Sequence, residues 1–299
     1  MNGIKSHRLR GDIWATVSAL ATGGGYTVAK TLLVTLPPIV FNAYMFLFGS
    51  VIILIDAGLN RKLKETIFIP PAQIGFYAIV AIFFSAATYC LFTALSFSEP
   101  ATVSFLSRLE LVSTIILASI FLKERLQKSE VFGLILVVAG ILVMRYDASI
   151  ELSRTVTLVT LGSLFFGTAE VLTKWKIDWI NYRSYIFYRG IFMSGIFVTI
   201  GIVSGKFVII TDLKLLVLLI LTAFLLPYLG RTGYLKSMKY INISRSSIIV
   251  QSQPFFAAIV ALMILNSFPS VKEIAGGLLL VGGVILMKVL EKKAATATR

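Results

Sequence analysis

Two opposite charges stand near the middle of an apolar segment of this chain. In the stretch FLSRLELV, residues 105–112, Arg108 and Glu110 interrupt an apolar run that extends from about Ala101 to Leu122. An ionisable side chain at the centre of a bilayer costs about 2.5 to 3.5 kcal/mol on insertion scales, so such residues usually face the bundle interior or a water-filled cavity. Residues two apart on a helix are separated by roughly 200°, so these charges pair poorly with each other. Each therefore needs a partner on another helix or in a ligand.

Other apolar runs also contain polar side chains. Together with the first two, the ionisable ones are Lys30, Arg108, Glu110, Glu170, Arg189 and Arg231, and the neutral ones are Asn42, Gln251 and Gln253. Tyr26 and Tyr89 lie deep in their runs and are candidate aromatic walls of a cavity. We treat these side chains as candidate substrate-binding residues.

Two interpretations of the charges stay open at this point. As ties between helices, Arg108 would pair with Glu170, and Glu110 with Lys30 or Arg231. As a binding site, cations in excess of anions favour a carboxylate or another anionic group, which the planar fork of arginine binds through both oxygens. The glutamates would then hold an ammonium group, or one of them would carry a coupling proton. A zwitterion satisfies both signs, which favours an amino acid or a similar metabolite.

The composition indicates the elements that must position these residues. Of 299 residues, 57% are hydrophobic and 14% are charged, with mean hydropathy +0.90, whereas soluble domains carry about 25% charged residues. The sequence therefore predicts an all-α integral membrane protein with ten spanning helices. Their approximate ranges are 11–36, 38–59, 71–97, 100–122, 129–146, 154–176, 184–204, 212–238, 243–265 and 269–290.

The distribution of basic residues predicts the orientation in the membrane. Alternate connections are rich in Lys and Arg, as in the stretches 61–64, 123–128, 174–183 and 288–293, while the other connections hold only Arg145, Arg154, Lys206, Lys214 and Lys272. By the positive-inside rule both termini lie in the cytoplasm. The net charge of +14 then reflects topology and contact with anionic lipid, not a nucleic-acid partner. We expect a multi-pass protein of the bacterial inner membrane.

Residues needed for several other chemistries are missing from the sequence. Cys90 is the single cysteine, and His7, the single histidine, lies in the N-terminal tail, so no intramembrane histidine or cysteine metal site is expected. The sequence has no P-loop, no GxGxxG after a strand and no HExxH. We therefore expect neither an enzyme nor a bound cofactor, and leave proton coupling open.

The chain contains an internal repeat. A shift of about 143 residues places Phe97 on Tyr240, Glu110 on Gln253 and Gly140 on Gly283, and it superposes the fourth and fifth helices on the ninth and tenth without a gap. We predict two five-helix units, residues 1–150 and 151–299. Because each unit has an odd number of helices, the second enters the membrane from the opposite side, as in inverted-repeat secondary transporters whose site lies between the repeats.

Several motifs of the two units match one known family. In the first unit they are Ala94-Leu95-Ser96-Phe97, Pro100-Ala101, Leu109-Glu110, Leu122-Lys123-Glu124 and Gly133 through Gly140, and in the second Met238-Lys239-Tyr240, Gln253-Pro254, Gly276 and Gly283. Over nearly the whole chain the sequence resembles the EamA repeat of the drug/metabolite transporter superfamily. The resemblance implies export or exchange of small metabolites, including amino acids, with helices 1, 3, 4, 6, 8 and 9 around a central cavity.

The sequence thus favours a secondary transporter of amino acids or related zwitterions that works by alternating access, through efflux or exchange. The alternatives are uptake or exchange of an anionic metabolite or nucleotide derivative, and a membrane scaffold or sensor that transports nothing. Gly23, Gly24 and Gly25 in the first helix are candidates for a hinge or for close packing, and Pro227 and Pro254 are candidate kinks. The expected partners are a small-molecule substrate and lipid, in a monomer or a homodimer.

Overall fold

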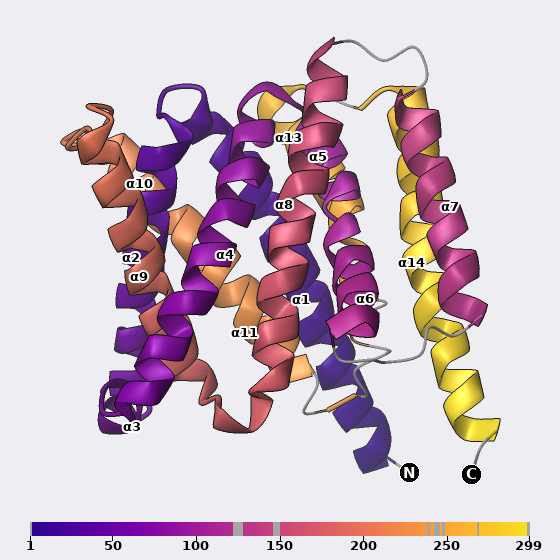
Figure 1. The fold of residues 1–299 in the computed structure, drawn as a ribbon, viewed down its shortest axis with the longest axis horizontal. Helices are drawn as coiled ribbons and strands as arrows, with labels where there is room; N and C mark the ends of the chain where they lie inside the picture. Colours follow the sequence, from indigo (N-terminus) through magenta and orange to yellow (C-terminus); the bar gives the residue numbers. More distant parts are fainter. Residues whose placement is uncertain are drawn as a thin grey trace.

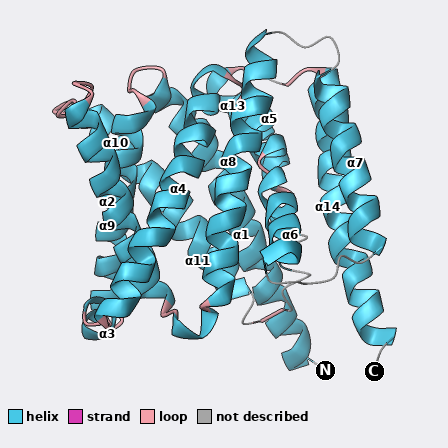
Figure 2. Cartoon of the chain, in the orientation of Figure 1, coloured by secondary structure: helices cyan, strands magenta, loops and turns pink. Residues whose placement is uncertain are grey.

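The structure, a computed structural model, describes residues 2–121, 128–145, 150–237, 240–241, 246, 249–267 and 269–297. Within these ranges the regular structure is helical, with no strand (Figure 2). The first half contains α1 (Asn2–Leu33), α2 (Pro38–Leu59), α3 (Leu63–Ile67), α4 (Pro71–Phe97), α5 (Pro100–Leu106), α6 (Leu109–Phe121) and α7 (Lys128–Arg145). The second half contains α8 (Ile150–Trp175), the 3-10 helix η1 (Ile177–Trp179), α9 (Tyr182–Val203), α10 (Leu213–Ala223), the π-helix η2 (Phe224–Gly230), α11 (Arg231–Ser237), α13 (Gln253–Leu265) and α14 (Val271–Ala297).

Local sequence signals explain where several helices begin. Pro38, Pro71 and Pro100 each stand at the first position of a helix, where the missing N–H costs nothing and the fixed φ suits the helix. The side chain of Asn181 accepts a hydrogen bond from the Arg183 amide ahead of α9, and Asp212 caps α10 in the same way. The first residues of these helices agree with the predicted boundaries to within a few residues.

Membrane-spanning character is widespread along the chain. Among the described residues, six helices are long and apolar enough to cross a bilayer: Pro38–Leu59, Pro71–Phe97, Pro100–Phe121, Ile150–Trp175, Tyr182–Val203 and Leu213–Tyr234. Two shorter apolar helices, Val131–Met144 and Gln253–Leu265, accompany them. The other two predicted spans, 11–36 and 269–290, overlap α1 and α14. The exact number of ten spans stays a prediction.

The fourth helix of the first half is interrupted, which the sequence reading over 100–122 did not anticipate. α5 ends at Leu106 and α6 begins at Leu109. The Ser104 carbonyl accepts hydrogen bonds from the Ser107 hydroxyl at 2.8 Å and from Arg108 Nε at 3.3 Å, while the Arg108 amide donates to Phe105 O instead. Side chains thus take the carbonyl that the helix ladder would use, and the ladder breaks there.

The second half has a break at the equivalent place. α13 begins at Gln253, directly after a turn at Gln251 and Ser252. Pro254 has no amide hydrogen to donate back into that turn, and it disfavours helical geometry in the residue before it. Pro227, the other predicted kink, lies within the π-helix η2, where a missing N–H is accommodated by a shifted hydrogen-bond pattern.

The two halves pack reciprocally. α1 packs against α13, η2 and α11, while its counterpart α8 packs against α6 and α4. α2 packs against α9, and α7 pairs with α14 at one flank of the bundle, on the right in Figure 1. α1 rises from the end of the bundle that carries both termini, whereas α8 descends towards it (Figure 1). Helices of each half therefore complete the surroundings of the other half.

Glycines allow the closest of these approaches. A Cβ on Gly140 would lie 2.6 Å from the Gly276 carbonyl oxygen, and one on Gly283 would lie 2.6 Å from the Gly133 carbonyl oxygen. In α1 the helix continues through the glycine triplet without a break. A Cβ on Gly23 would lie 2.7 Å from the Gln253 carbonyl oxygen, so in this conformation that glycine allows α1 and α13 to pack closely.

Candidate functional site

A cavity of about 410 Å³ lies between the two halves. Its walls come from α1, α2, α4, α6, α8, α9, η2 and α11, together with residues 107–108 and 250–253 at the two helix breaks. Eight of the predicted site residues line it: Tyr26, Arg108, Glu110, Glu170, Arg189, Arg231, Gln251 and Gln253. The structure therefore gathers most of the intramembrane charges around one space.

Arg108 connects the two halves at the helix breaks. Its Nη1 donates to Gln251 Oε1 at 3.0 Å, and its Nη2 donates to Gln253 Oε1 at 2.6 Å and to the Ser107 hydroxyl at 3.1 Å. Gln251 and Gln253 occupy the repeat positions of Arg108 and Glu110, so the contact joins equivalent segments across the interface. The partners are amides and not Glu170, the tie considered from the sequence.

Glu170 has a different partner. Arg231 Nη2 lies 3.8 Å from Glu170 Oε1, an ion pair between α8 and α11. The side chains of Arg231 and Glu170 are 31% and 23% exposed, so the pair is partly solvated, and that carboxylate oxygen accepts no hydrogen bond. A pair this long, made within one half, leaves both groups able to rearrange towards a ligand.

Glu110 points into the cavity without a direct partner among the described residues. Its carboxylate makes none of the hydrogen bonds or ion pairs found there, although it lies within electrostatic range of Arg108 and Glu170. Neither Lys30 nor Arg231, the two ties considered from the sequence, contacts it. A carboxylate in this position can receive an ammonium group or a proton.

Arg189 is the most enclosed of the cavity arginines. It is 9% exposed, and its guanidinium carbon lies 4.4 Å from the ring centre of Phe84 and 4.9 Å from that of Tyr185. Its Nε is buried and has no hydrogen-bond partner. Cation–π contact with two rings holds the guanidinium in place without neutralising its charge.

Three of the predicted site residues do not line the cavity. Lys30 is half-buried and its Nζ donates to the Ser96 carbonyl at 3.0 Å. Asn42 is fully buried in α2, where its Nδ2 donates to the Pro38 carbonyl at 2.7 Å. Tyr89 is 41% exposed on α4 and lies outside the cavity wall. The cavity thus contains three of the four predicted cations.

Other lining residues were not singled out from the sequence. Ser18 and Thr22 line the cavity together with Tyr26, and their spacing of four residues on α1 is a signal that could have identified them. The apolar wall formed by Met45, Phe46, Phe84, Phe166 and Met193 carries no such signal, because these residue types equally face lipid or fill a core.

Comparison with known proteins agrees with this architecture. The model of the EamA-like transporter family matches the chain twice, over residues 9–146 and 153–289. No curated protein matches the sequence. One solved crystal structure, titled only as that of a protein, covers 96% of this chain and 98% of its own with a TM-score of 0.65 at 16% identity, which shows a shared fold. The two family matches cover nearly the whole chain and confirm the resemblance noted from the motifs: the chain belongs to the EamA-like transporter family.

Proposed function

We propose that this membrane transporter moves amino acids or related zwitterions across the bacterial inner membrane by alternating access, through efflux or exchange, with both termini in the cytoplasm. The halves 1–150 and 151–299 would rock against each other around the cavity. One observation carries the proposal: Arg108, at a helix break of one half, binds Gln251 and Gln253 at the equivalent break of the other. Broken helices that meet between inverted repeats are where secondary transporters place their substrates.

The charges around the cavity support a zwitterionic ligand. Glu110 can receive an ammonium group, and the arginines can receive a carboxylate. Glu110 is also our candidate carrier of a coupling proton, since no described side chain contacts its carboxylate directly.

A second candidate is an anionic metabolite or nucleotide derivative. Arg108, Arg189 and Arg231 outnumber Glu110 and Glu170 at the cavity wall, which favours negative charge in the ligand. A thermal-shift screen of detergent-purified protein with amino acids, amines, nucleosides and organic acids separates the two candidates. A ligand at 100 times its dissociation constant stabilises the protein by about 2.7 kcal/mol.

Flux into liposomes then tests transport itself. We expect purified protein to exchange the hits of the screen, with counter-transport of unlabelled substrate accelerating uptake of labelled substrate, as a carrier does and a channel does not. Arg108→Gln and Glu110→Gln are expected to abolish flux while the protein stays folded and inserted. Lys206→Gln is the matched control, because it removes the charge of an exposed side chain outside the cavity, and it should keep wild-type flux. Wild-type flux in both cavity variants would show that Arg108 and Glu110 are not part of the substrate site.

A further inference from the structure

The three arginines of the cavity differ in how their charge is satisfied. Arg108 gives hydrogen bonds to Gln251, Gln253, Ser107 and the Ser104 carbonyl. These four contacts occupy both Nη atoms and Nε. Arg231 has an ion pair with Glu170. Both side chains therefore already have protein partners.

Arg189 has no such partner within the described part of the chain. Among the described residues it makes no hydrogen bond or ion pair, its guanidinium lies over the rings of Phe84 and Tyr185, and its Nε is buried with no acceptor. An arginine that is 91% buried keeps its charge, so an unpaired guanidinium is costly unless something else binds it. Because the side chain also lines the cavity, the missing acceptor fits a ligand group.

The formal charges of the cavity wall indicate the sign and size of the charge that a ligand would need to neutralise them. Among the described residues, three arginines and two glutamates line it, which leaves a net formal charge of +1. The Arg231 and Glu170 charges cancel locally, and Glu110 lies within electrostatic range of Arg108. The remaining positive charge belongs to Arg189. One negative group neutralises it, whereas a dianion would bring excess charge into a largely apolar site.

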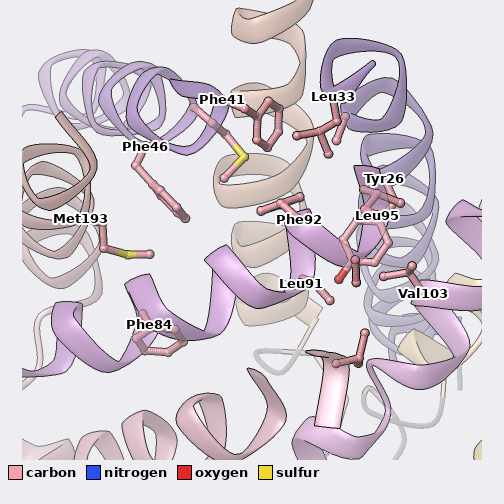
Figure 3. Close-up of a cluster of buried hydrophobic side chains, with 14 of the residues drawn as sticks. Tyr26, Leu33, Phe41, Phe46, Phe84, Leu91, Phe92, Leu95, Val103 and Met193 are labelled. Carbon is pink, nitrogen blue, oxygen red and sulfur yellow. The ribbon is translucent and has the colours of Figure 1, made fainter. Parts of the chain in front are cut away.

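The surroundings of Arg189 are apolar. Figure 3 shows the side chains of Phe46 and Met193 directed towards the space between α2, α4 and α9, with Phe84 nearby on α4. All three line the cavity, and none is more than 7% exposed. A ligand group held at Arg189 would therefore have hydrocarbon next to it.

We propose that Arg189 is the anion subsite of the transporter, and that the substrate is a monocarboxylate whose apolar part lies against Phe46, Phe84 and Met193. This inference rests on the proposed transport function, and it narrows the ligand to an apolar amino acid or a related apolar acid. Arg108 holds the two helix breaks together and does not receive the carboxylate in this conformation.

The test uses three matched probes in thermal-shift and liposome-flux measurements. Leucine carries both charges, leucinamide lacks the carboxylate, and 4-methylpentanoate lacks the ammonium group; phenylalanine and its two analogues form a parallel series. We expect wild-type protein to respond to the acids and to discriminate against the amides. Arg189→Met keeps a long apolar side chain without the charge, and it should weaken binding of the acids roughly ten- to a hundredfold, with little change for the amides. Arg189→Lys should restore part of the discrimination.

Arg154→Met is the matched control, because Arg154 also lies over a phenylalanine ring, 4.9 Å from the centre of Phe97, but is exposed and outside the cavity. It should leave the preference for acids unchanged. Equal responses of the wild type to acids and amides would overturn the inference without any variant, as would unchanged discrimination in Arg189→Met. If only dianions or nucleotides were transported, the assignment of a monocarboxylate substrate would be wrong, while the proposed transport function would still hold. No flux of any screened compound would instead contradict the proposed function.

Discussion

Arg108 contacts two side-chain amides across the interface, and the charge of these partners determines how strong the contact is. A carboxylate opposite Arg108 would add a second, opposite charge to bonds that the guanidinium already makes to neutral amides, and the contact would become an ion pair. Gln251 and Gln253 join the two helix breaks without adding a negative charge. Under the proposed alternating access this contact must open in each cycle, and a neutral partner lowers the free energy needed to open it.

We therefore expect Gln253→Glu to make the protein more stable and less active. The new carboxylate would replace the Oε1 atom that lies 2.6 Å from Arg108 Nη2, adding about 1 kcal/mol of stability in this conformation. Thermal unfolding and liposome flux measured on the same preparation check both signs. Gln73→Glu, the same change near the start of α4 and outside the cavity, should keep wild-type flux. Faster flux in Gln253→Glu would contradict the argument.

Much of the charged site could be predicted from the sequence, because an ionisable residue deep in an apolar run has few places to go except the bundle interior. The repeat register also aligned Arg108 with Gln251 and Glu110 with Gln253, but it did not predict the hydrogen bonds of Arg108 to both glutamines. The sequence could not show towards which neighbouring helix or cavity each of these side chains points. Lys30 and Asn42 also lie within apolar runs, yet each donates to a backbone carbonyl and not to the cavity. Whether such a side chain finds a backbone acceptor, as Lys30 does on α4, depends on how neighbouring helices pack.

At the scale of elements, the glycine triplet of α1 gives a sharp contrast between adjacent positions. A Cβ on Gly23 would lie 2.7 Å from the Gln253 carbonyl oxygen and 2.8 Å from the Ala257 nitrogen, both backbone atoms that cannot turn aside. A Cβ on Gly24 would have Val260 as its nearest neighbour, at 4.0 Å. Only the first glycine is required for α1 to approach α13.

Gly23→Ala should therefore destabilise the protein by roughly 1 to 3 kcal/mol through overpacking, and flux should fall because α1 displaces Gln253. Gly24→Ala should be neutral or stabilising by roughly 0.5 to 1 kcal/mol, since alanine restricts the unfolded chain and favours the helix. Thermal unfolding and flux of the two variants provide the comparison. Equal behaviour of the pair would mean that the triplet acts as a flexible hinge and not as a packing surface.

Most helix ranges were predictable from apolar run length and from prolines, but the helix break in the first half was not. Nothing in the apolar pattern of 100–122 marks the interruption at Ser107 and Arg108, which arises when their side chains take the Ser104 carbonyl. Pro254 did indicate the equivalent break in the second half. Side-chain hydrogen bonds to the backbone depend on rotamers, and run length carries no information about rotamers.

For the whole molecule, Figure 1 places both termini at the same end of the bundle, together with α3 and the connection between α8 and α9. These segments are adjacent to or contain Lys62, Lys64, Lys176 and Arg183. The common end of the termini and the basic connections thus agree with each other, and they support the proposed cytoplasmic location of that end.

Aromatic and aliphatic side chains pack together at the part of the cavity wall formed by the first half. Tyr26 and Phe92 line the cavity and pack edge to face, with ring centres 6.4 Å apart, and Phe41 packs against Phe92 at 4.8 Å. Figure 3 also labels Leu95 and Val103 in this cluster, and both are fully buried. This layer comes from α1, α2, α4 and α5 of the first half. Alternating access requires it to open when the other end closes.

Cysteine accessibility tests that motion in a Cys90→Ala background, where the single native and buried thiol is removed. We expect Val103→Cys to react slowly with a membrane-impermeant maleimide, and Ser204→Cys, exposed at the same end, to react quickly. Tyr234→Cys, on the α11 side of the cavity, should be labelled from the cytoplasmic face. Saturating substrate should change the labelling rates of Val103→Cys and Tyr234→Cys in opposite directions, because one cavity opens alternately to each side. Parallel changes in both rates would indicate a channel-like opening and contradict alternating access, since a carrier never exposes its site to both faces at once.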